Sequence, residues 1–446
     1  MSGKNDEPFA VKTELGWSIV GGSQMDSEEN FDTFGQTYRT VSMRVEAPIS
    51  IDSQSNVKYA RKAKVKEVTT ADFLQMMERD FHEIDGKDTI SQEDKKFLQI
   101  VRDGIHQSDD GYYEMPLPFK KGEPTLPNNR RAAMSRLVGL KSQLLKRPQY
   151  REHYMTFMNE IFHRGDAEKV PAEEVSMSNS WCIPHHGVYH PKKPNKVRVV
   201  FDRSARYQGT CLNDHLLQGP DLINPMIGVL CRFQHGPIAF TCDVEKMYHK
   251  FRVTKLHQNY LRFLWWEDGD LSKPPVDYRM KVHLFGATSS PGCANFGLKQ
   301  IAEEHKDLSV EAAEFLTRNF YVDDGLKCES SEEDASDLIQ KAVSICAKGN
   351  LRLHKFICNS PQVTSSIPES ERAAVAKTSL ELGQHDSTAI ERALCLQWCI
   401  DSDELCFRLT LKDHPLTRGG ILATVASIYD PLGLIAHLVL VGRQIL

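Results

Sequence analysis

The sequence lacks several features that would each assign it to a class of proteins. Its first residues, MSGKNDEPFAVK, contain no apolar stretch of the kind that directs secretion. Its most apolar run, PLGLIAHLVLVG, is too short to span a bilayer and is expected to be a core helix. Its eleven cysteines include no C-x-x-C pair and no zinc-knuckle spacing, which favours reduced thiols over a disulfide framework. We therefore expect an intracellular protein, either cytoplasmic (free or in particles) or nuclear, with no membrane partner.

Length and composition predict a globular chain with more than one domain. A chain of 446 residues with 40% hydrophobic and 26% charged residues is too long for one ordinary core, so about two or three domains are expected. The formal charge of −5 argues mildly against a nucleic-acid partner, but it is an average over the whole chain. No internal repeat and no low-complexity tract is present.

Basic residues gather in two stretches of the chain. The second is KKPNKVRVVFDRSAR, and the first runs from 120 to 151 and contains Lys120, Lys121, Arg130, Arg131, Arg136, Lys141, Lys146, Arg147 and Arg151. Each stretch is either an ordinary solvated face or part of a track for nucleic-acid phosphates. The sequence leaves both interpretations open.

The N-terminal third reads as a strand, a linker and then helices. Residues 1–22 end in the strand-like LGWSIVGG, and residues 23–68 are polar and weakly patterned, which is typical of a linker. Thr70 and Ser91 can each cap a helix, the first over 71–81 and the second up to Gly104. A proline-rich extended segment at 111–129 precedes two basic helices, at 130–146 and 148–165.

From about residue 180 the pattern becomes strand-like. KVRVVFD and IAFTCDV are typical strands, and RNFYVDDGLKC reads as a β-hairpin. Ser331 and Asp334 form a capping box for a helix that ends at Gly349, after which LRLHKFICN returns as a strand. This order predicts an α+β domain with helices on one face of an antiparallel sheet.

The adjacent aspartates Asp323 and Asp324 at the tip of this hairpin need an explanation, because neighbouring like charges repel. They are either solvated turn residues or the ligands of a cation that they share with a third carboxylate. Asp243, at the end of the apolar strand IAFTCDV, is the candidate for that third carboxylate. Oxygen ligands from these residues suit two Mg²⁺ ions, which Mn²⁺ could replace.

The segment between the two aspartate positions supports the second reading. In HLFGATSSPGCAN, Phe285 and Gly286 predict a tight turn, and Ser290 with Pro291 predicts a helix start. This leaves a flat surface against which a base pair could lie. A Y-x-D-D string alone arises by chance in roughly a few per cent of chains of this size. Chance does not explain the order in which the motifs follow one another: strand-Asp, F-G-x-x-S-S-P, Y-x-D-D, a helix and a lysine-bearing strand.

In this order the motifs resemble those of reverse transcriptases. VRVVFD, CLNDHLLQGPDL, FTCDVEKMYHKFRV, LFGATSSPGCAN, FYVDDGL and NLRLHKFICN carry the resemblance, over roughly 110–446. WCIPHHGVY, LNDHLLQGPDL, DVEKMYHKF and YDPLGLI look most like the polymerases of Pao/Bel-type LTR retrotransposons, as part of a pol polyprotein. TELGWSIVGG is similar to the last strand of a retropepsin, although no D-[ST]-G of a protease active site is present.

The resemblance implies a right-hand polymerase. Its parts would be a protease remnant at 1–22, a linker and helical lead-in at 23–109, fingers at 110–235, a palm at 236–360 interleaved with them, and a thumb or connection segment at 361–446. It implies DNA synthesis from deoxynucleoside triphosphates on a primed RNA or DNA template. Ribonuclease H and integrase domains are then expected on separate chains. The alternative is a catalytically silent, nucleic-acid-binding module left from a truncated element.

The resemblance also implies roles for residues at the catalytic centre. Asp243 and Asp323 would be metal ligands, and Asp324 would complete the triad. Tyr321 would pack under the primer terminus. Lys355 falls near the position proposed for a general acid that protonates pyrophosphate.

A second set of positions would contact the incoming nucleotide. Tyr248 matches the aromatic that blocks a ribose 2′-hydroxyl, and Arg198 matches the fingers arginine that grips the triphosphate. Phe285 and Gly286 would lie against the nascent base pair. From the basic stretch, Lys120, Lys121, Arg130, Arg131 and Arg136 are predicted to contact backbone phosphates.

Three other groups of residues have competing explanations. Histidines near Cys182 could suggest zinc, but the spacing of Cys182, His185, His186 and His190 matches no tetrahedral site. Trp265 and Trp266 either stack on bases or, as we expect, pack in a strand. The last three cysteines, Cys395, Cys399 and Cys406, are spaced as a loose helical set of core thiols.

Overall fold

The computed structural model describes residues 9–13, 16–20, 41–43 and 91–373 except 178, 191 and 192, followed by 390–394, 396–400, 403–406, 415, 417–427 and 440. The chain divides into two compact units, Met1–His82 and Glu83–Leu446. The helix predicted after Thr70 and nearly all of the C-terminal apolar run lie outside the described residues. Within the described part, every helix is too short or too polar to cross a membrane.

The first unit contains a three-stranded antiparallel sheet in the order β1–β2–β3. The strands are β1 (Phe9–Thr13), β2 (Gly16–Val20) and β3 (Val41–Met43). β2 confirms the strand predicted from the apolar run GWSIV. β3 lies inside the segment predicted as a linker, so that prediction is wrong for these 3 residues, which pair with β2.

The helices at the start of the second unit follow their sequence signals. Helix α2 (Gln92–Gly104) begins after Ser91, whose side chain accepts a hydrogen bond from the Asp94 N–H at 3.0 Å. α3 (Arg130–Lys146) and α4 (Pro148–His163) match the two predicted basic helices. α4 buries Tyr150, Tyr154, Met158 and Ile161 on one face, which leaves its other face polar.

A first hydrophobic core lies under α3 and α4. It contains a sheet in the order β11–β12–β6 and the hairpin of β7 and β8, with bounds β6 (Ala167–Lys169), β7 (His185–His190), β8 (Lys193–Phe201), β11 (Arg262–Trp265) and β12 (Val276–Met280). Trp265 and Trp266 are buried in this core, which confirms their packing role. Several hydrophobic residues between 253 and 287 join the same core, among them Val253, Tyr260, Met280 and Leu284.

A four-stranded antiparallel sheet in the order β13–β14–β9–β15 carries the aspartate motifs. Its strands are β9 (Ile238–Val244), β13 (Phe320–Tyr321), β14 (Asp324–Glu329) and β15 (Leu353–Cys358). One face packs in a second core with α7 (Ser290–Glu304), α8 (Val310–Arg318) and α9 (Glu332–Lys348). The Ser331 cap, the Ser290 helix start and the apolar stripe of α9 are as predicted.

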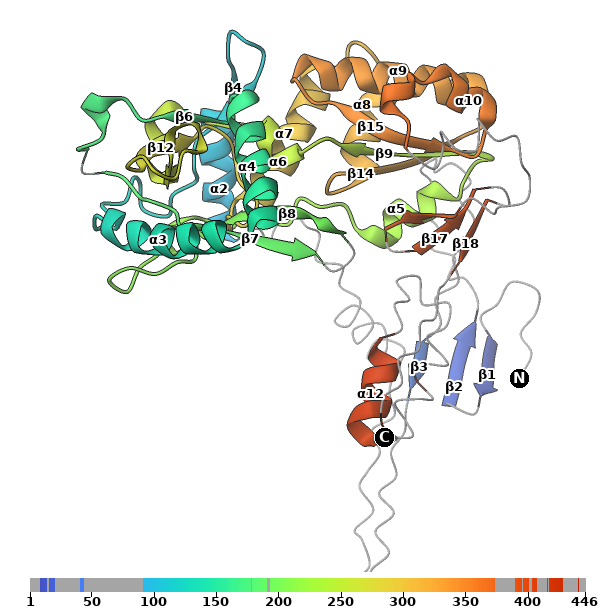
Figure 1. The fold of residues 1–446 in the computed structure, drawn as a ribbon. Helices are drawn as coiled ribbons and strands as arrows, with labels where there is room; N and C mark the ends of the chain where they lie inside the picture. The colour runs from blue at the N-terminus through green and yellow to red at the C-terminus, as the bar shows by residue number, and fades with distance from the viewer. Residues whose placement is uncertain are drawn as a thin grey trace, which may run out of the picture. The chain divides into compact units, whose positions relative to one another are not determined.

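The opposite face of this sheet is partly covered too. Helix α5 (Met226–Phe233) packs there in a third core that includes Ala239, Leu326 and Trp398 (Figure 1). The prediction of helices on one face is therefore incomplete. Trp398 belongs to a small sheet of β16 (Ile390–Ala393), β17 (Leu396–Cys399) and β18 (Glu404–Cys406). Because Cys399 and Cys406 lie on paired strands, the helical arrangement predicted for these cysteines is wrong.

The remaining described elements are short. They are β4 (His106–Gln107), β5 (Tyr113–Met115) and β10 (Arg252–Val253) in one small sheet, the helices α6 (Met247–Lys250), α10 (Pro361–Ser366) and α12 (Arg418–Ala426), and 3-10 turns at Ala172–Glu174, Leu212–His215, Lys255–Leu261, Glu267–Gly269 and Glu369–Glu371. The mixture of helices with mainly antiparallel sheets confirms the α+β class.

Candidate active site

The three aspartates singled out by the sequence meet at one end of the four-stranded sheet. Asp243, the sixth residue of β9, pairs directly with Asp324, the first residue of β14. Asp323 belongs to the turn before β14, and its carbonyl accepts a 2.9 Å hydrogen bond from the Val244 N–H. The backbone hydrogen bonds of the sheet therefore hold all three aspartates in fixed positions relative to one another.

The turn that carries Asp323 has an unusual backbone. Val322 has a φ of 60°, in the left-handed region that β-branched residues rarely adopt. Such a conformation costs of the order of 1–3 kcal/mol and persists only where the surrounding structure imposes it. Here the pairing of β13 with β14 on one side and the bond from Val244 on the other impose it.

Crowding of the carboxylates raises their proton affinity. The pKa of Asp324 is raised to about 7 by desolvation, then by the charges of Asp323 and Asp243. Desolvation and the charge of Asp243 also raise the pKa of Asp323. Keeping these carboxylates ionised so close together therefore costs electrostatic free energy, and a positive group placed between them would lower that cost.

A lysine and a histidine side chain already approach Asp243. The Lys355 ammonium donates a hydrogen bond to Oδ2 of Asp243, and Nε2 of His354 lies 3.4 Å from Oδ1. Consecutive strand residues normally point to opposite faces, but β15 has a bulge between His354 and Ile357, and Lys355 has a φ of 53°. The bulge is what brings both side chains to one carboxylate.

The donor chemistry of the three aspartates suits Mg²⁺, which prefers carboxylate oxygens. Among the described residues, however, no three His, Cys, Asp or Glu side chains converge closely enough to hold one ion as they stand. Lys355 shares one oxygen of Asp243. A cation held by all three aspartates would therefore require their side chains to rearrange.

A second group of predicted residues meets beside the aspartates. The Tyr248 ring, half-buried on α6, lies edge-on to the Phe285 ring with centroids 5.7 Å apart. The guanidinium of Arg198, on β8, lies over Phe285 at 5.9 Å from the ring centroid. Burial, then the charge of Asp323, raises the pKa of Tyr248. The structure thus brings together three residues that are 37 to 87 positions apart in the sequence (285 − 248 and 285 − 198).

The turn at Phe285 and Gly286 is as predicted. Gly286 has a φ of +91°, and a Cβ at this position would meet no atom within 4 Å. Glycine is therefore required by the backbone conformation and not by packing. Phe285 is 63% exposed, so the turn presents a ring and a bare backbone to open space. Tyr321 is partly buried against the third core, next to the aspartate turn.

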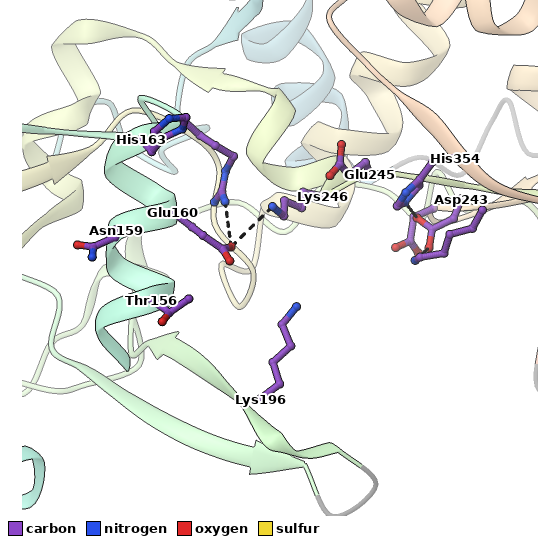
Figure 2. Close-up of a pocket in the computed structure, with 12 residues that line it drawn as sticks. Thr156, Asn159, Glu160, His163, Lys196, Asp243, Glu245, Lys246 and His354 are labelled. Atoms are coloured by element: carbon purple, nitrogen blue, oxygen red, sulfur yellow. Dashed lines mark hydrogen bonds and ion pairs between the residues drawn. The ribbon is translucent and has the colours of Figure 1, made fainter. Parts of the chain in front are cut away.

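A cleft of about 910 Å³ opens over Asp243 and Asp323. Figure 2 shows it between α4, the β7–β8 hairpin and the end of β9, lined by Thr156, Asn159, Glu160, His163, Arg164, Lys196, Asp243, Glu245, Lys246, Asp323, His354 and Lys355. The α4 wall was missed by the sequence analysis. Its signal was the polar stripe at 156, 159, 160 and 163, which has the spacing of one helix face opposite the buried tyrosines.

The predicted basic patch separates into two kinds of residue. Lys120, Lys121 and Arg131 are exposed, and within the described chain no carboxylate forms an ion pair with them. Arg130 donates to both oxygens of the buried Asp277, with its Nη2 2.7 Å from Oδ2, and Arg136 pairs with Asp202 at 3.0 Å. Arg130 therefore ties α3 to β12, a structural role that the sequence did not predict.

Among the histidines near Cys182, His185 has hydrogen-bond partners other than a metal. His185 is fully enclosed between the Tyr154 hydroxyl at one ring nitrogen and the Leu264 carbonyl, 3.0 Å away, at the other. Burial lowers the pKa of His185 to about 4, so the ring is neutral at pH 7. This is a hydrogen-bonded core histidine.

Comparisons with known proteins gave structural matches alone. No protein-family model matches the chain, and no curated protein matches it. Two similar solved structures are the native prototype foamy virus protease–reverse transcriptase (14% identity, TM-score 0.34, 46% of this chain and 24% of that one) and the foamy viral protease–reverse transcriptase dRH in complex with double-stranded DNA (15% identity, TM-score 0.30, 46% and 32%). This chain thus spans a third or less of their length, and these values place it in no family.

Proposed function

We propose that the chain is a templated nucleotidyltransferase of the reverse transcriptase kind, derived from a Pao/Bel-type LTR element. The observation that carries the proposal is the pairing of Asp243 with Asp324, with Asp323 in the adjoining turn, at the mouth of an open cleft. Bound Mg²⁺ would lower the pKa of a primer 3′-hydroxyl and offset the charge of departing pyrophosphate. Asp243, Asp323 and Asp324 are the residues that would hold it.

The remaining residues bind and orient the substrates in this proposal. Arg198 would pair with the triphosphate of a deoxynucleotide, while Phe285 and Gly286 support its base. Tyr248, in contact with Phe285, would occupy the space that a 2′-hydroxyl needs. Lys355, which is hydrogen-bonded to Asp243, would give up its proton to the departing pyrophosphate.

A second candidate function is a polymerase-like module that binds nucleic acid without catalysis. The bond from Lys355 to Asp243 favours it, because an ammonium there can neutralise the aspartates without any metal.

Primer extension separates the two candidates. The purified chain is given poly(rA)/oligo(dT) and dTTP with Mg²⁺ or Mn²⁺, and the Asp243→Asn variant serves as the matched control. Extension by the wild type alone supports the polymerase. Retention of the primed template by both proteins, with no extension by either, supports the binding module.

A further inference from the structure

A buried arginine, Arg203, lies behind the Phe285–Gly286 turn. It follows the end of β8 by two residues and is 1% exposed. Its Nη2 donates a 2.7 Å hydrogen bond to the carbonyl of Leu284, the residue that leads into the turn. The same carbonyl accepts a second 2.7 Å bond from the Ser290 hydroxyl at the start of α7. Arg203 therefore connects the end of a strand, a turn and a helix start.

This arginine is costly to bury. Among the described residues no carboxylate forms an ion pair with it, and its Nε and Nη1 atoms have no hydrogen-bond partner. Two other fully buried polar side chains, His283 and Ser289, belong to the same turn region. Burial lowers the pKa of Arg203 to about 9, which leaves it charged at neutral pH. An unpaired buried charge normally destabilises a fold. The benefit of Arg203 is therefore expected to lie in the segment that its hydrogen bond positions.

Arg203 positions the backbone of Leu284, the residue that precedes the exposed Phe285. The Asn213 side chain also supports the turn: it donates to the Gly286 carbonyl at 3.3 Å and accepts from the Thr288 N–H at 3.4 Å. Both bonds are longer than those to Leu284, and Asn213 is partly exposed. The short hydrogen bonds to the Leu284 carbonyl thus determine the position of Phe285. The Phe285 ring in turn contacts both Tyr248 and Arg198.

We propose that Arg203 is a positioning residue that fixes the Phe285–Gly286 turn against Tyr248 and so sets nucleotide affinity and sugar selection. The predicted change in KM and in sugar selection rests on the proposed polymerase function. The predicted loosening of the turn does not. Arg203 touches no reacting atom. Its loss should raise KM for dNTP and lower the dNTP/rNTP ratio while kcat is kept.

The test compares Arg203→Met with Arg262→Met. Arg262 is also 1% exposed and also donates to backbone carbonyls, those of Val175 at 3.0 Å and Glu174, on β11 away from the turn. Hydrogen exchange of a peptide covering 284–289 should accelerate roughly two- to tenfold in Arg203→Met, the equivalent of one lost hydrogen bond, and stay unchanged in Arg262→Met. This measurement requires no enzymatic activity.

The kinetic arm uses the same proteins. KM for dNTP should rise by a similar roughly two- to tenfold in Arg203→Met with kcat within about twofold, and Arg203→Lys should restore part of it, since lysine keeps one donor. Ser290→Ala, which removes the other donor to Leu284, should move both measurements in the same direction and replaces Arg203→Met if that variant does not fold. Unchanged exchange at 284–289 overturns the positioning role. Faster exchange with an unchanged KM overturns its link to the nucleotide. A wild type that extends no primer overturns the proposed function, while the exchange arm still decides whether Arg203 holds the turn.

Discussion

Asp324 lies directly opposite Asp243 across the ladder between β14 and β9. In an isolated pair of strands two facing carboxylates would destabilise the sheet. Here the pKa of Asp324 is raised to about 7 by desolvation and by its acidic neighbours, so the arrangement carries an electrostatic cost in the folded protein. A cation bound between these carboxylates, as proposed above, would lower this cost.

The first prediction is that Asp243→Asn and Asp323→Asn abolish primer extension but not template binding. Each removes one anionic ligand and no phosphate contact, and the loss of several kcal/mol of charge stabilisation corresponds to about a thousandfold in rate. Extension assays and a filter-binding titration measure the two effects. Near-wild-type extension by either variant would show that the metal site is assigned wrongly.

The second prediction separates phosphate contacts from structural ion pairs in the basic patch. Neutralising Lys120, Lys121 and Arg131 together should reduce the slope of log affinity against log salt by about two to three, since each phosphate contact contributes roughly 0.7–0.9. Binding is measured on a primed duplex between low and moderate salt. An unchanged slope would mean an ordinary solvated face.

The matched control for the patch is Arg130→Gln. This variant leaves the Asp277 carboxylate, whose side chain is 4% exposed, without its bidentate partner. We expect a loss of about 1–3 kcal/mol in the free energy of unfolding and little change in the salt slope. Denaturant titration measures the first. A change in the slope with no loss of stability would reverse the two roles.

The third prediction concerns sugar choice. Tyr248→Ala should admit ribonucleotides while the variant still extends with deoxynucleotides, because a steric clash worth several kcal/mol is removed. The dNTP/rNTP incorporation ratio should fall roughly a hundredfold. Phe285→Ala, which removes the edge-on contact to Tyr248, should shift the ratio by about tenfold or less. Equal loss of both activities in Tyr248→Ala would make Tyr248 a packing residue.

The fourth prediction is an acid-induced loss of stability caused by His185. Its folded-state pKa of about 4 lies below the ordinary histidine value of 6.5, so the neutral form is favoured in the folded protein. The corresponding stability is present above pH 6.5 and is lost as the pH falls toward 4, by up to about 3 kcal/mol. Thermal melts across this window should therefore fall more steeply for the wild type than for His185→Gln. The exposed His186→Gln is the control and should follow the wild type.

The sequence predicted local structure well where a cap or a periodic stripe defined it. Ser91, Ser331 and the buried face of α9 were identified because their signals lie within a few neighbouring residues. The aspartates were identified because their motifs are short. The bond from Arg130 to Asp277 was not predicted, since its partners are 147 positions apart and only the packing of α3 on β12 brings them together. The α4 wall of the cleft was missed for a related reason, because a polar helix face gives no sign of what lies across from it.

The bulge in β15 has a consequence for the length of this strand. Leu353 faces Val244 in the ladder, yet the next inward apolar side chain is Phe356, three positions later instead of two. One inserted residue therefore interrupts the regular alternation of side chains between the two faces of the strand. Lys355 is the inserted residue, and its side chain lies on the face of Asp243. Deleting it would restore regular alternation, keep Phe356 and Cys358 inward, and take an ammonium away from Asp243. A deletion of one codon would thus alter the charge balance of the site while Leu353, Phe356 and Cys358 still alternate toward the core.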